Sequence, residues 1–209
     1  LSPEDIIVLS GPSHAEEVAQ KYPTAIVAAC LDKVLAKEVQ GLFSNEHFRV
    51  YTSIDVAGVE IGGAAKNVIA LAVGICHGLG FGDNTMAALC TRGLEEISRL
   101  GTVLGAERST FSGLSGFGDL IVTAYSSHSR NRKVGIRIGK GEKLNDIISN
   151  MKMVAEGVET TRSIYDLSRK KDIEMPICEQ IYQVLFEDIP PRQAILELMG
   201  RELVDEHPV

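Results

Sequence analysis

The amino-acid sequence predicts an α/β remnant, part of a doubly wound parallel sheet, followed by a mostly α-helical domain. Within residues 1–53, short runs rich in β-branched residues alternate with helix-like segments in the order β-α-β-α-β. From residue 54 onwards, strand-like runs nearly disappear and apolar residues recur at helical spacing. We therefore expect two units, residues 1–53 and residues 54–209.

The first unit is expected to contain three strands, because three short apolar runs alternate with helix-like segments. The strands are predicted at residues 6–9, 25–28 and 48–51, and the helices at residues 15–20 and 32–43. Parallel strands with crossover helices are the natural packing for this order. A sheet of three strands leaves its edges exposed and its faces poorly covered. We therefore expect this unit to be the tail of a larger sheet, and the chain to be a piece of a longer protein.

The second unit is expected to be a series of helices. The first long helix is predicted at residues 66–75, and Asn84 is expected to cap the next, since its side chain can bond free amides at a helix start. Pro176 and the pair Pro190-Pro191 suit the beginnings of later helices. These later helices are predicted at residues 144–149, 160–170, 177–186 and 192–203.

Composition and charge exclude several classes of function. The formal net charge of -7 disfavours a general nucleic-acid surface, because phosphate backbones are bound mainly through Lys and Arg. The cysteines form no C-x-x-C pair and the histidines show no metal-ligand spacing, so we expect reduced thiols and no metal site. No apolar run approaches the roughly 20 residues that span a bilayer, and the amino terminus does not resemble a signal peptide. We therefore expect a cytoplasmic protein without a membrane span.

Two glycine-rich stretches, residues 78–82 and 113–118, do not have the G-x-G-x-x-G spacing that cradles a pyrophosphate after a strand. Tight turns or close helix contacts are the favoured interpretation of these glycines, and direct contact with a ligand is the alternative. The segment from Gly11 to Ala15 joins the first predicted strand to the first helix, where free amides could bind an anion. Ser13 could equally be an ordinary helix cap.

Lys66 stands out because its neighbours, from Gly62 to Ala70, are all small, apolar or amide residues. An ammonium in such surroundings is a candidate for proton transfer, and a lysine extending to water is the alternative. Asp119 and Thr123 lie four residues apart and share a face if their segment is helical. A polar face of this kind favours a ligand, although Asp119 could instead be a helix cap.

Ser129, Arg130 and Asn131 bring a hydroxyl, a planar guanidinium and an amide together in three consecutive residues. These groups are suitable donors for phosphate oxygens. A solvated loop is the competing interpretation of this triplet, and the same alternative applies to Glu156.

Taken together, the segments discussed above resemble the bacterial-type NAD(P)-dependent glycerol-3-phosphate dehydrogenase family in their order, their amino acids and their mutual spacing. The resemblance covers almost the whole chain. The strongest stretches are LSGPSHAEEV from Leu9, VEIGGAAKNVIALAVGICHGLGFGDNT from Val59, TRGLEEISRLG from Thr91, and TFSGLSGFGDLIVTAYSSHSRNRKVG from Thr110. The resemblance implies a dinucleotide-binding α/β domain, of which residues 1–53 are the tail, and a helical substrate-binding and catalytic domain over residues 54–209. It implies interconversion of sn-glycerol 3-phosphate and dihydroxyacetone phosphate, which supplies a precursor for phospholipid synthesis.

The resemblance also implies roles for single residues. Lys66 matches the lysine that donates and accepts the proton. Positions that hold the substrate are matched by Gly11, Ser13, Asp119, Ser129, Arg130 and Asn131, with Lys66, Asn67 and Thr123 as further lining. Cofactor contacts are matched by Ala15, Arg130, Val154 and Glu156.

The expected cofactor is NAD or NADP, and the expected partner is a small phosphorylated substrate, with a homodimer left open. The family's glycine loop has no counterpart in this sequence, so we expect the chain to be inactive by itself. Two alternatives remain: a non-catalytic helical interaction domain, and a related dehydrogenase for another small hydroxy acid.

Overall fold

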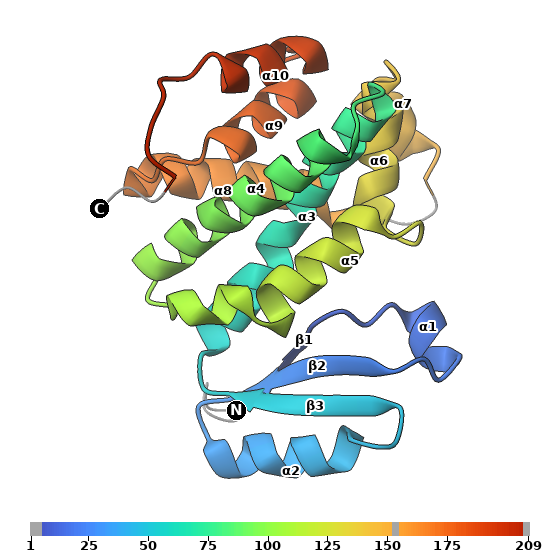
Figure 1. Ribbon diagram of the computed structural model, residues 1–209, viewed down its shortest axis with the longest axis vertical. Coiled ribbons are helices and arrows are strands. Elements are labelled where there is room, and N and C mark those ends of the chain that lie inside the picture. The colour runs from blue at the N-terminus through green and yellow to red at the C-terminus, as the bar shows by residue number, and fades with distance from the viewer. Residues whose placement is uncertain (1–5, 152–154, 207–209) are drawn as a thin grey trace.

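The structure, a computed structural model, describes residues 6–151 and 155–206. A small sheet with one covering helix lies at one end of the molecule, and a bundle of helices forms the rest (Figure 1). The sheet contains β1 (Val8–Ser10), β2 (Thr24–Ala29) and β3 (Phe48–Ser53), in the order β1-β2-β3. The sequence therefore predicted the succession of a partial α/β unit and a helical unit correctly.

The predicted parallel pairing is confirmed for one strand pair and wrong for the other. β2 and β3 are parallel, with Thr24 opposite Phe48, whereas β1 and β2 are antiparallel, with Val8 opposite Ala29. The connecting helices explain the difference. α1 (Ala15–Ala19) has only 5 residues, about 8 Å of helix, which is too short to return the chain along a strand of about 20 Å. α2 (Lys33–Phe43) has 11 residues and makes a true crossover.

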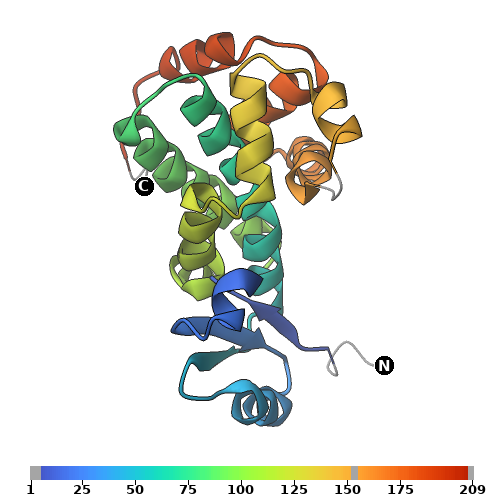
Figure 2. The ribbon, with the colours of Figure 1, turned by 90° about the vertical axis from the view of Figure 1, so that its right-hand side faces the viewer.

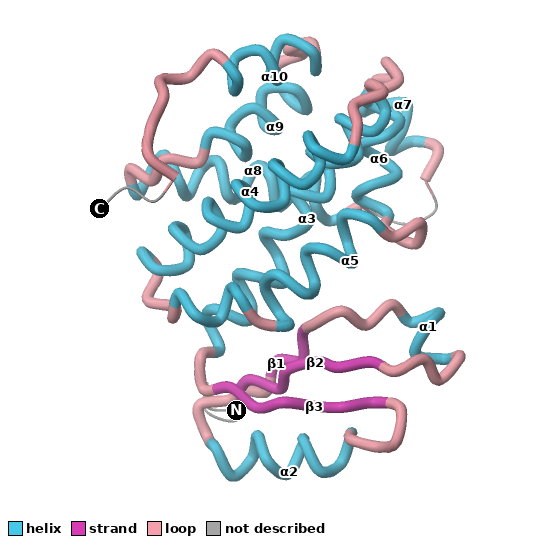
Figure 3. The backbone as a smooth tube through the Cα atoms, viewed as in Figure 1, coloured by secondary structure: helices cyan, strands magenta, loops and turns pink. Residues whose placement is uncertain are grey.

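α2 covers one face of the sheet (Figure 3). Its N-cap is Asp32, whose carboxylate accepts hydrogen bonds from the amides of Val34 at 2.7 Å and Leu35 at 3.3 Å. The buried core of this unit is small, with Ile26, Ala28 and Val50 at its centre. Apolar side chains remain exposed on it, among them Leu9, Val34 and Leu42. The sheet unit is thus poorly covered, as expected for three strands.

The helical unit is arranged around α3 (Figure 2). Its helices are α3 (Val56–Gly78), α4 (Asp83–Val103), α5 (Asp119–Tyr125), α6 (Arg130–Gly139), α7 (Leu144–Ser149), α8 (Glu156–Lys171), α9 (Pro176–Phe186) and α10 (Pro191–Met199). A short 3-10 helix, Arg108–Ser112, and one π-helical turn, Leu114–Gly118, connect α4 to α5. Pro176 and Pro191 each stand at the first position of a helix, as predicted.

Several predicted boundaries were wrong. α3 begins ten residues before the predicted position 66, because Asp55 caps it through the Gly58 amide at 2.9 Å. Asn84 is not a cap, since α4 already begins at Asp83 and Gly82 is its N-cap. α10 was predicted to end at residue 203, but it ends at Met199, and Gly200 is its C-cap. Such shifts arise because caps depend on side-chain contacts that periodicity does not reveal.

α3 is also more apolar than the sequence analysis allowed. Within the described residues it is the one helix that is long and apolar enough to cross a membrane, by length and composition alone. However, 72% of its apolar window is buried inside the protein, as in a core helix. The helix was predicted to begin at residue 66, so the apolar residues from Val56 onwards were not counted as part of it.

α3 and α6 approach each other closely along a seam of four glycines, Gly74, Gly78, Gly135 and Gly139. A Cβ atom at Gly74 would lie 2.3 Å from the Arg132 carbonyl oxygen, and one at Gly135 would lie 2.3 Å from that of Leu71. Gly78 and Gly139 face the other helix in the same way. Close helix contact, the favoured interpretation for residue 78, is therefore confirmed. The seam brings the two backbones together, and it places the start of α6 beside the middle of α3.

Candidate functional site

Lys66 and Asp119 form an ion pair at the boundary between the sheet and the helical bundle. Lys66 projects from α3, and Asp119 is the first residue of α5. The Lys66 ammonium contacts the Asp119 carboxylate, and their side chains are 16% and 5% exposed. Lys66 therefore does not extend freely to water, which was the alternative interpretation of this residue.

Asp119 is held in place by its own helix as well. The Thr123 hydroxyl donates a hydrogen bond of 3.3 Å to the second carboxylate oxygen of Asp119, so the two residues share one face as predicted. The N-cap of α5 is Gly118, so Asp119 is not an ordinary cap. Burial raises the pKa of Asp119 above its usual value, while the Lys66 ammonium and the Thr123 hydroxyl offset part of that rise.

An open pocket of about 420 Å³ includes this ion pair. One wall comes from the end of β1 and the turn that follows it, and the other from one face of α3. The lining residues are Val8, Leu9, Ser10, Gly11, Ser13, Val59, Glu60, Gly63, Lys66 and Asp119. Four of the residues predicted from the sequence, namely Gly11, Ser13, Lys66 and Asp119, are thus brought together.

The turn after β1 has a conformation that suits glycine. Gly11 has a φ of +142°, and a Cβ at this position would lie 3.0 Å from the Cα of Ile26 on the neighbouring strand. Ser13 is exposed, and its hydroxyl donates to the Gly11 carbonyl at 3.1 Å instead of capping α1. The helix-cap interpretation of Ser13 is therefore wrong. Ser13 nevertheless lines the pocket.

The segment from Ser129 to Asn131 is the start of a helix, so its interpretation as a solvated loop is wrong. Ser129 is the N-cap of α6, and its hydroxyl accepts a hydrogen bond from the Arg132 amide at 3.2 Å. Arg130 is exposed at the first helical position, whereas Asn131 is only 7% exposed. The amide of Asn131 donates to the side-chain oxygen of Asn67, the residue after Lys66, at 2.9 Å.

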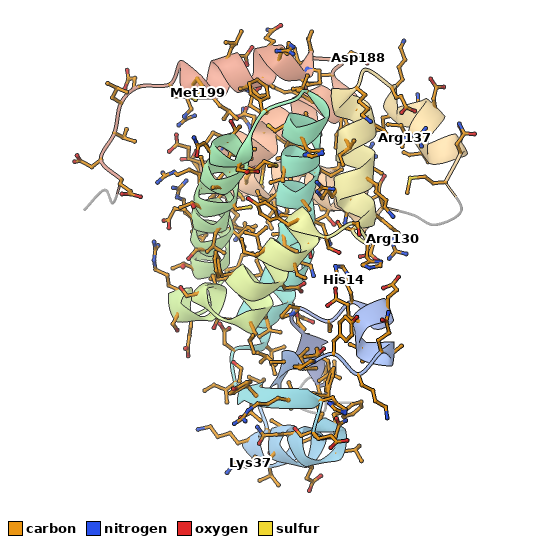
Figure 4. All side chains as sticks on the ribbon, turned by 45° about the vertical axis from the view of Figure 1, so that its right-hand side comes forward. His14, Lys37, Arg130, Arg137, Asp188 and Met199 are labelled. Atoms are coloured by element: carbon orange, nitrogen blue, oxygen red, sulfur yellow. The ribbon has the colours of Figure 1, made fainter. Side chains whose placement is uncertain are left out.

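Arg130 and Ser129 do not line the pocket described above. They nevertheless lie near its wall, because the ring of His14, which follows Ser13, is 5.7 Å from the ring of His128, which precedes Ser129. Figure 4 labels His14 near the start of α1 and Arg130 at the facing end of α6. The turn after β1, the middle of α3 and the start of α6 therefore meet in one region.

The residues predicted to contact a cofactor are more dispersed. Ala15 is the first residue of α1, and Glu156 is the exposed first residue of α8. Glu156 lies beside the start of α6, because the next amide, that of Gly157, donates to the Asn131 side chain at 2.9 Å. Val154 lies outside the described residues.

Several residues of this region were not predicted from the sequence. Ser10 and Glu60 line the pocket, and the buried Nε2 atom of His14 has no hydrogen-bond partner among the described residues. Ser10 could have been found from its place at the end of a strand, directly before Gly11. Glu60 carried no comparable signal. Within residues 6–151 and 155–206, no group of three or more His, Cys, Asp or Glu side chains could hold a metal ion.

Two family models match this chain. Residues 55–196, more than half of the chain, match the family described as the NAD-dependent glycerol-3-phosphate dehydrogenase C-terminus. Residues 1–36 match the corresponding N-terminus family. The second match ends within α2, so it covers only part of the sheet unit.

The curated relatives that the chain matches are also glycerol-3-phosphate dehydrogenases. The chain is 58% identical over 196 residues to a glycerol-3-phosphate dehydrogenase [NAD(P)+] of Shouchella clausii, covering 94% of this chain and 58% of the relative. It is 60% identical over 195 residues to that of Pelotomaculum thermopropionicum, covering 93% and 56%. The chain thus spans less than two thirds of these relatives.

Solved structures share the fold. The crystal structure of glycerol-3-phosphate dehydrogenase from Coxiella burnetii superimposes with a TM-score of 0.90 at 40% identity, covering 93% of this chain and 60% of that one. The enzyme structure from Saccharomyces cerevisiae gives a TM-score of 0.82 at 29% identity, covering 92% and 59%. With the family match over residues 55–196, these likenesses show that the chain belongs to the NAD-dependent glycerol-3-phosphate dehydrogenase family.

Proposed function

We propose that this chain is the substrate-binding and catalytic part of an enzyme that interconverts sn-glycerol 3-phosphate and dihydroxyacetone phosphate with NAD or NADP. The observation that carries the proposal is the Lys66–Asp119 ion pair in an open pocket, in a chain of this family. A primary ammonium held at a pocket wall can donate a proton to a ketone oxygen and remove it from an alcohol.

In the direction of reduction, Lys66 donates its proton to the carbonyl oxygen of the substrate and becomes a neutral amine. The nicotinamide supplies the hydride that forms the new C–H bond when the cofactor is bound. Asp119 holds the Lys66 side chain toward the pocket and balances its charge before the transfer. In the reverse direction, the neutral Lys66 amine accepts the proton of the secondary alcohol.

We assign the substrate phosphate to the start of α6. Ser129 and Arg130 offer a hydroxyl and a guanidinium at the amino-terminal end of α6, where the free backbone amides of a helix favour an anion. Gly11 and Ser13 form the opposite wall, and Asn67, Thr123 and Asn131 support the groups that touch the substrate. Binding the phosphate away from the reacting carbon fixes that carbon near Lys66.

The residues of this chain suit only the rim of a dinucleotide site. The turn between β1 and α1 contains Pro12, which has no amide hydrogen, and it lacks the G-x-G-x-x-G spacing. Ala15, Arg130 and Glu156 would contribute at the edge, and Val154, outside the described residues, stays a prediction. We therefore propose that residues 1–209 alone have little dehydrogenase activity, and we assign no preference between NAD and NADP.

The test is turnover by the natural full-length protein, including any segment that precedes residue 1. With dihydroxyacetone phosphate, we expect it to oxidise NADH or NADPH, measured by cofactor absorbance, whereas residues 1–209 alone do not. Lys66→Ala should lower kcat by about 10²- to 10⁴-fold, because the proton donor is lost. Lys37→Ala, at an exposed lysine on α2, is the matched control and should leave kcat unchanged.

Absence of turnover with both cofactors would sink the enzyme proposal and favour a non-catalytic helical interaction domain. The other alternative, an unphosphorylated small hydroxy acid as substrate, is separated by Arg130→Ala. At a saturating concentration of cofactor, this variant should raise KM for glycerol 3-phosphate by about tenfold or more, because a charge-assisted contact is lost, and should leave turnover of an unphosphorylated polyol unchanged. Equal losses for both substrates would contradict the phosphate assignment.

The same proposal places the enzyme in the cytoplasm. All four cysteines are buried and none of them forms a disulfide bond within the described residues, which is compatible with a reducing compartment. A homodimer formed through helices stays a prediction.

A further inference from the structure

The carboxamide of Asn131 joins three helices at one buried point. Its nitrogen donates to the side-chain oxygen of Asn67 on α3 at 2.9 Å, and its oxygen accepts from the Gly157 amide on α8 at 2.9 Å. Asn67 and Asn131 are each 7% exposed. Both hydrogen bonds are therefore shielded from water, and each would leave a buried polar group unsatisfied if it broke.

The bond to Gly157 is a helix cap supplied by another helix. Gly157 is the second residue of α8, so its amide has no partner within that helix. The N-cap of α8, Ala155, has no side-chain oxygen, and Asn131 takes over this role from α6. Because α8 has no cap of its own, the position of its first turn depends on Asn131.

Gly157 fits closely into this junction. A Cβ atom at this position would lie 2.7 Å from the Asn131 side-chain oxygen and 2.8 Å from the Asn67 carbonyl oxygen. One of these neighbours is backbone, which cannot rotate out of the way. An alanine here must therefore displace the start of α8 from Asn131.

Each member of the junction is the next residue after one that the proposed function uses. Asn67 follows Lys66, Asn131 follows Arg130, and Gly157 follows Glu156. The proton donor, the phosphate contact and the cofactor contact are thus each one peptide bond away from the same pair of hydrogen bonds. Ordering one of these segments must restrict the other two.

We propose that Asn131 is a positioning residue that couples the binding of glycerol 3-phosphate to the binding of the dinucleotide. This inference rests on the proposed function. Phosphate at the start of α6 holds Asn131 in place, and Asn131 then holds the first turn of α8 with Glu156. A cofactor that contacts this turn binds a segment whose ordering has already occurred, so each ligand tightens the binding of the other.

The test compares Gly157→Ala with Gly41→Ala in the natural full-length protein. Gly41 lies in α2, where an added Cβ meets nothing within 4 Å, so it is a matched glycine-to-alanine control. The dissociation constant of NADH or NADPH is measured by calorimetry with and without glycerol 3-phosphate, a pair that cannot react. We expect glycerol 3-phosphate to tighten cofactor binding about fivefold or more in the unchanged protein and in Gly41→Ala. In Gly157→Ala this ratio should fall to about one.

A purely structural role for the junction would lower the melting temperature of Gly157→Ala but leave the coupling ratio intact, and that result would overturn the proposal. So would a ratio of one in the unchanged protein. If Gly157→Ala does not fold, hydrogen exchange of the unchanged protein decides: glycerol 3-phosphate alone should slow exchange of the Gly157 amide, and an unchanged rate refutes the coupling. Turnover by the unchanged protein is measured in parallel, so failure of the proposed function is recognised separately.

Discussion

Two carboxylates in the helical unit are buried to a similar extent but have very different partners. Asp119, beside the pocket, is 4% exposed, and Glu96, on α4 near the start of α9, is 3% exposed. Burial raises the pKa of both, that of Glu96 to about 7. Asp119 pairs with the side-chain ammonium of Lys66, whereas Glu96 accepts hydrogen bonds from the backbone amides of Ile177 at 2.7 Å and Cys178 at 3.1 Å.

The difference teaches that the partners, rather than burial or a raised pKa, separate Asp119, to which we assign a function, from a carboxylate with a structural role. The cation beside Asp119 is partly exposed to the pocket, so a ligand can contact it. The amides beside Glu96 belong to the first turn of α9, whose N-cap, Met175, makes no side-chain cap. Glu96 therefore caps α9 from another helix and stabilises the contact of α4 with α9.

The largest effect that would test this contrast is expected from Glu96→Ala. The variant leaves two buried amides without acceptors and removes a helix cap, so the free energy of unfolding should fall by about 4 kcal/mol. Urea denaturation at pH 6 would measure the loss. Turnover per folded molecule should stay unchanged, since Glu96 is not part of the pocket.

The neighbouring Glu95 offers a matched control, because it pairs with Arg108 at 2.7 Å near the surface. Glu95→Ala should lower the free energy of unfolding by about 1 kcal/mol or less. Equal losses in the two variants would remove the distinction between a buried cap and a surface ion pair.

The pH dependence of stability sharpens the comparison further. The pKa of Glu96 is raised from 4.5 to about 7 in the folded protein, so between these values the folded state holds a proton that the unfolded state has lost. This contribution to stability is complete below about pH 4.5 and disappears as the pH rises through about 7. The contribution amounts to roughly 3 kcal/mol, the free energy that corresponds to raising the pKa from 4.5 to about 7.

In Glu96→Gln the side chain no longer titrates, but it keeps an oxygen that can accept the hydrogen bond from the Ile177 amide. The raised pKa of Asp119 contributes a pH dependence of the same sign to both proteins, so the difference between them isolates Glu96. Unfolding free energies from pH 4 to pH 8 should therefore show a smaller decline in the variant, and parallel curves would contradict the assignment.

The smallest effect is expected from Asp119→Asn. The uncharged amide avoids the burial of a carboxylate and can still accept the Thr123 hydrogen bond, while the Lys66 ammonium can turn toward the open pocket. Because burial already disfavours the charged form of Asp119, the free energy of unfolding should change by only about 1 kcal/mol or less. Thermal unfolding measures this change, and a loss as large as that of Glu96→Ala would mean that Asp119 is structural too.

The sequence alone predicted the features that depend on local chemistry. Proline at a first helical position and repeated apolar spacing placed α9 and α10 to within a residue at their starts. The antiparallel pairing of β1 was missed, because strand direction depends on how far α1 carries the chain. Glu96 was also missed, although its spacing from Gly93 and Leu100 puts a charged residue on the buried face of α4.

In the candidate site too, single residues could be predicted from the sequence, whereas the contacts between them could not. Lys66 was conspicuous among small neighbours, but its pairing with Asp119, 53 positions later, depends on how α3 and α5 pack. Likewise, the triplet beginning at Ser129 suggested a phosphate contact, whereas the inward direction of Asn131 follows from the approach of α6 to α3. Contacts between distant segments arise from packing, which local patterns do not contain.

The glycines shared by α3 and α6 have a mechanical consequence. The two backbones interlock at four points, so a shift of one helix along the other by a single residue would drive side chains such as Ile75 or Ile136 into spaces that admit only hydrogen. Gradual sliding between these helices is thereby blocked. The distance between the backbones at Lys66 and Arg130 is consequently set by this seam, and in the proposed function it would decide how long a ligand must be to contact both residues.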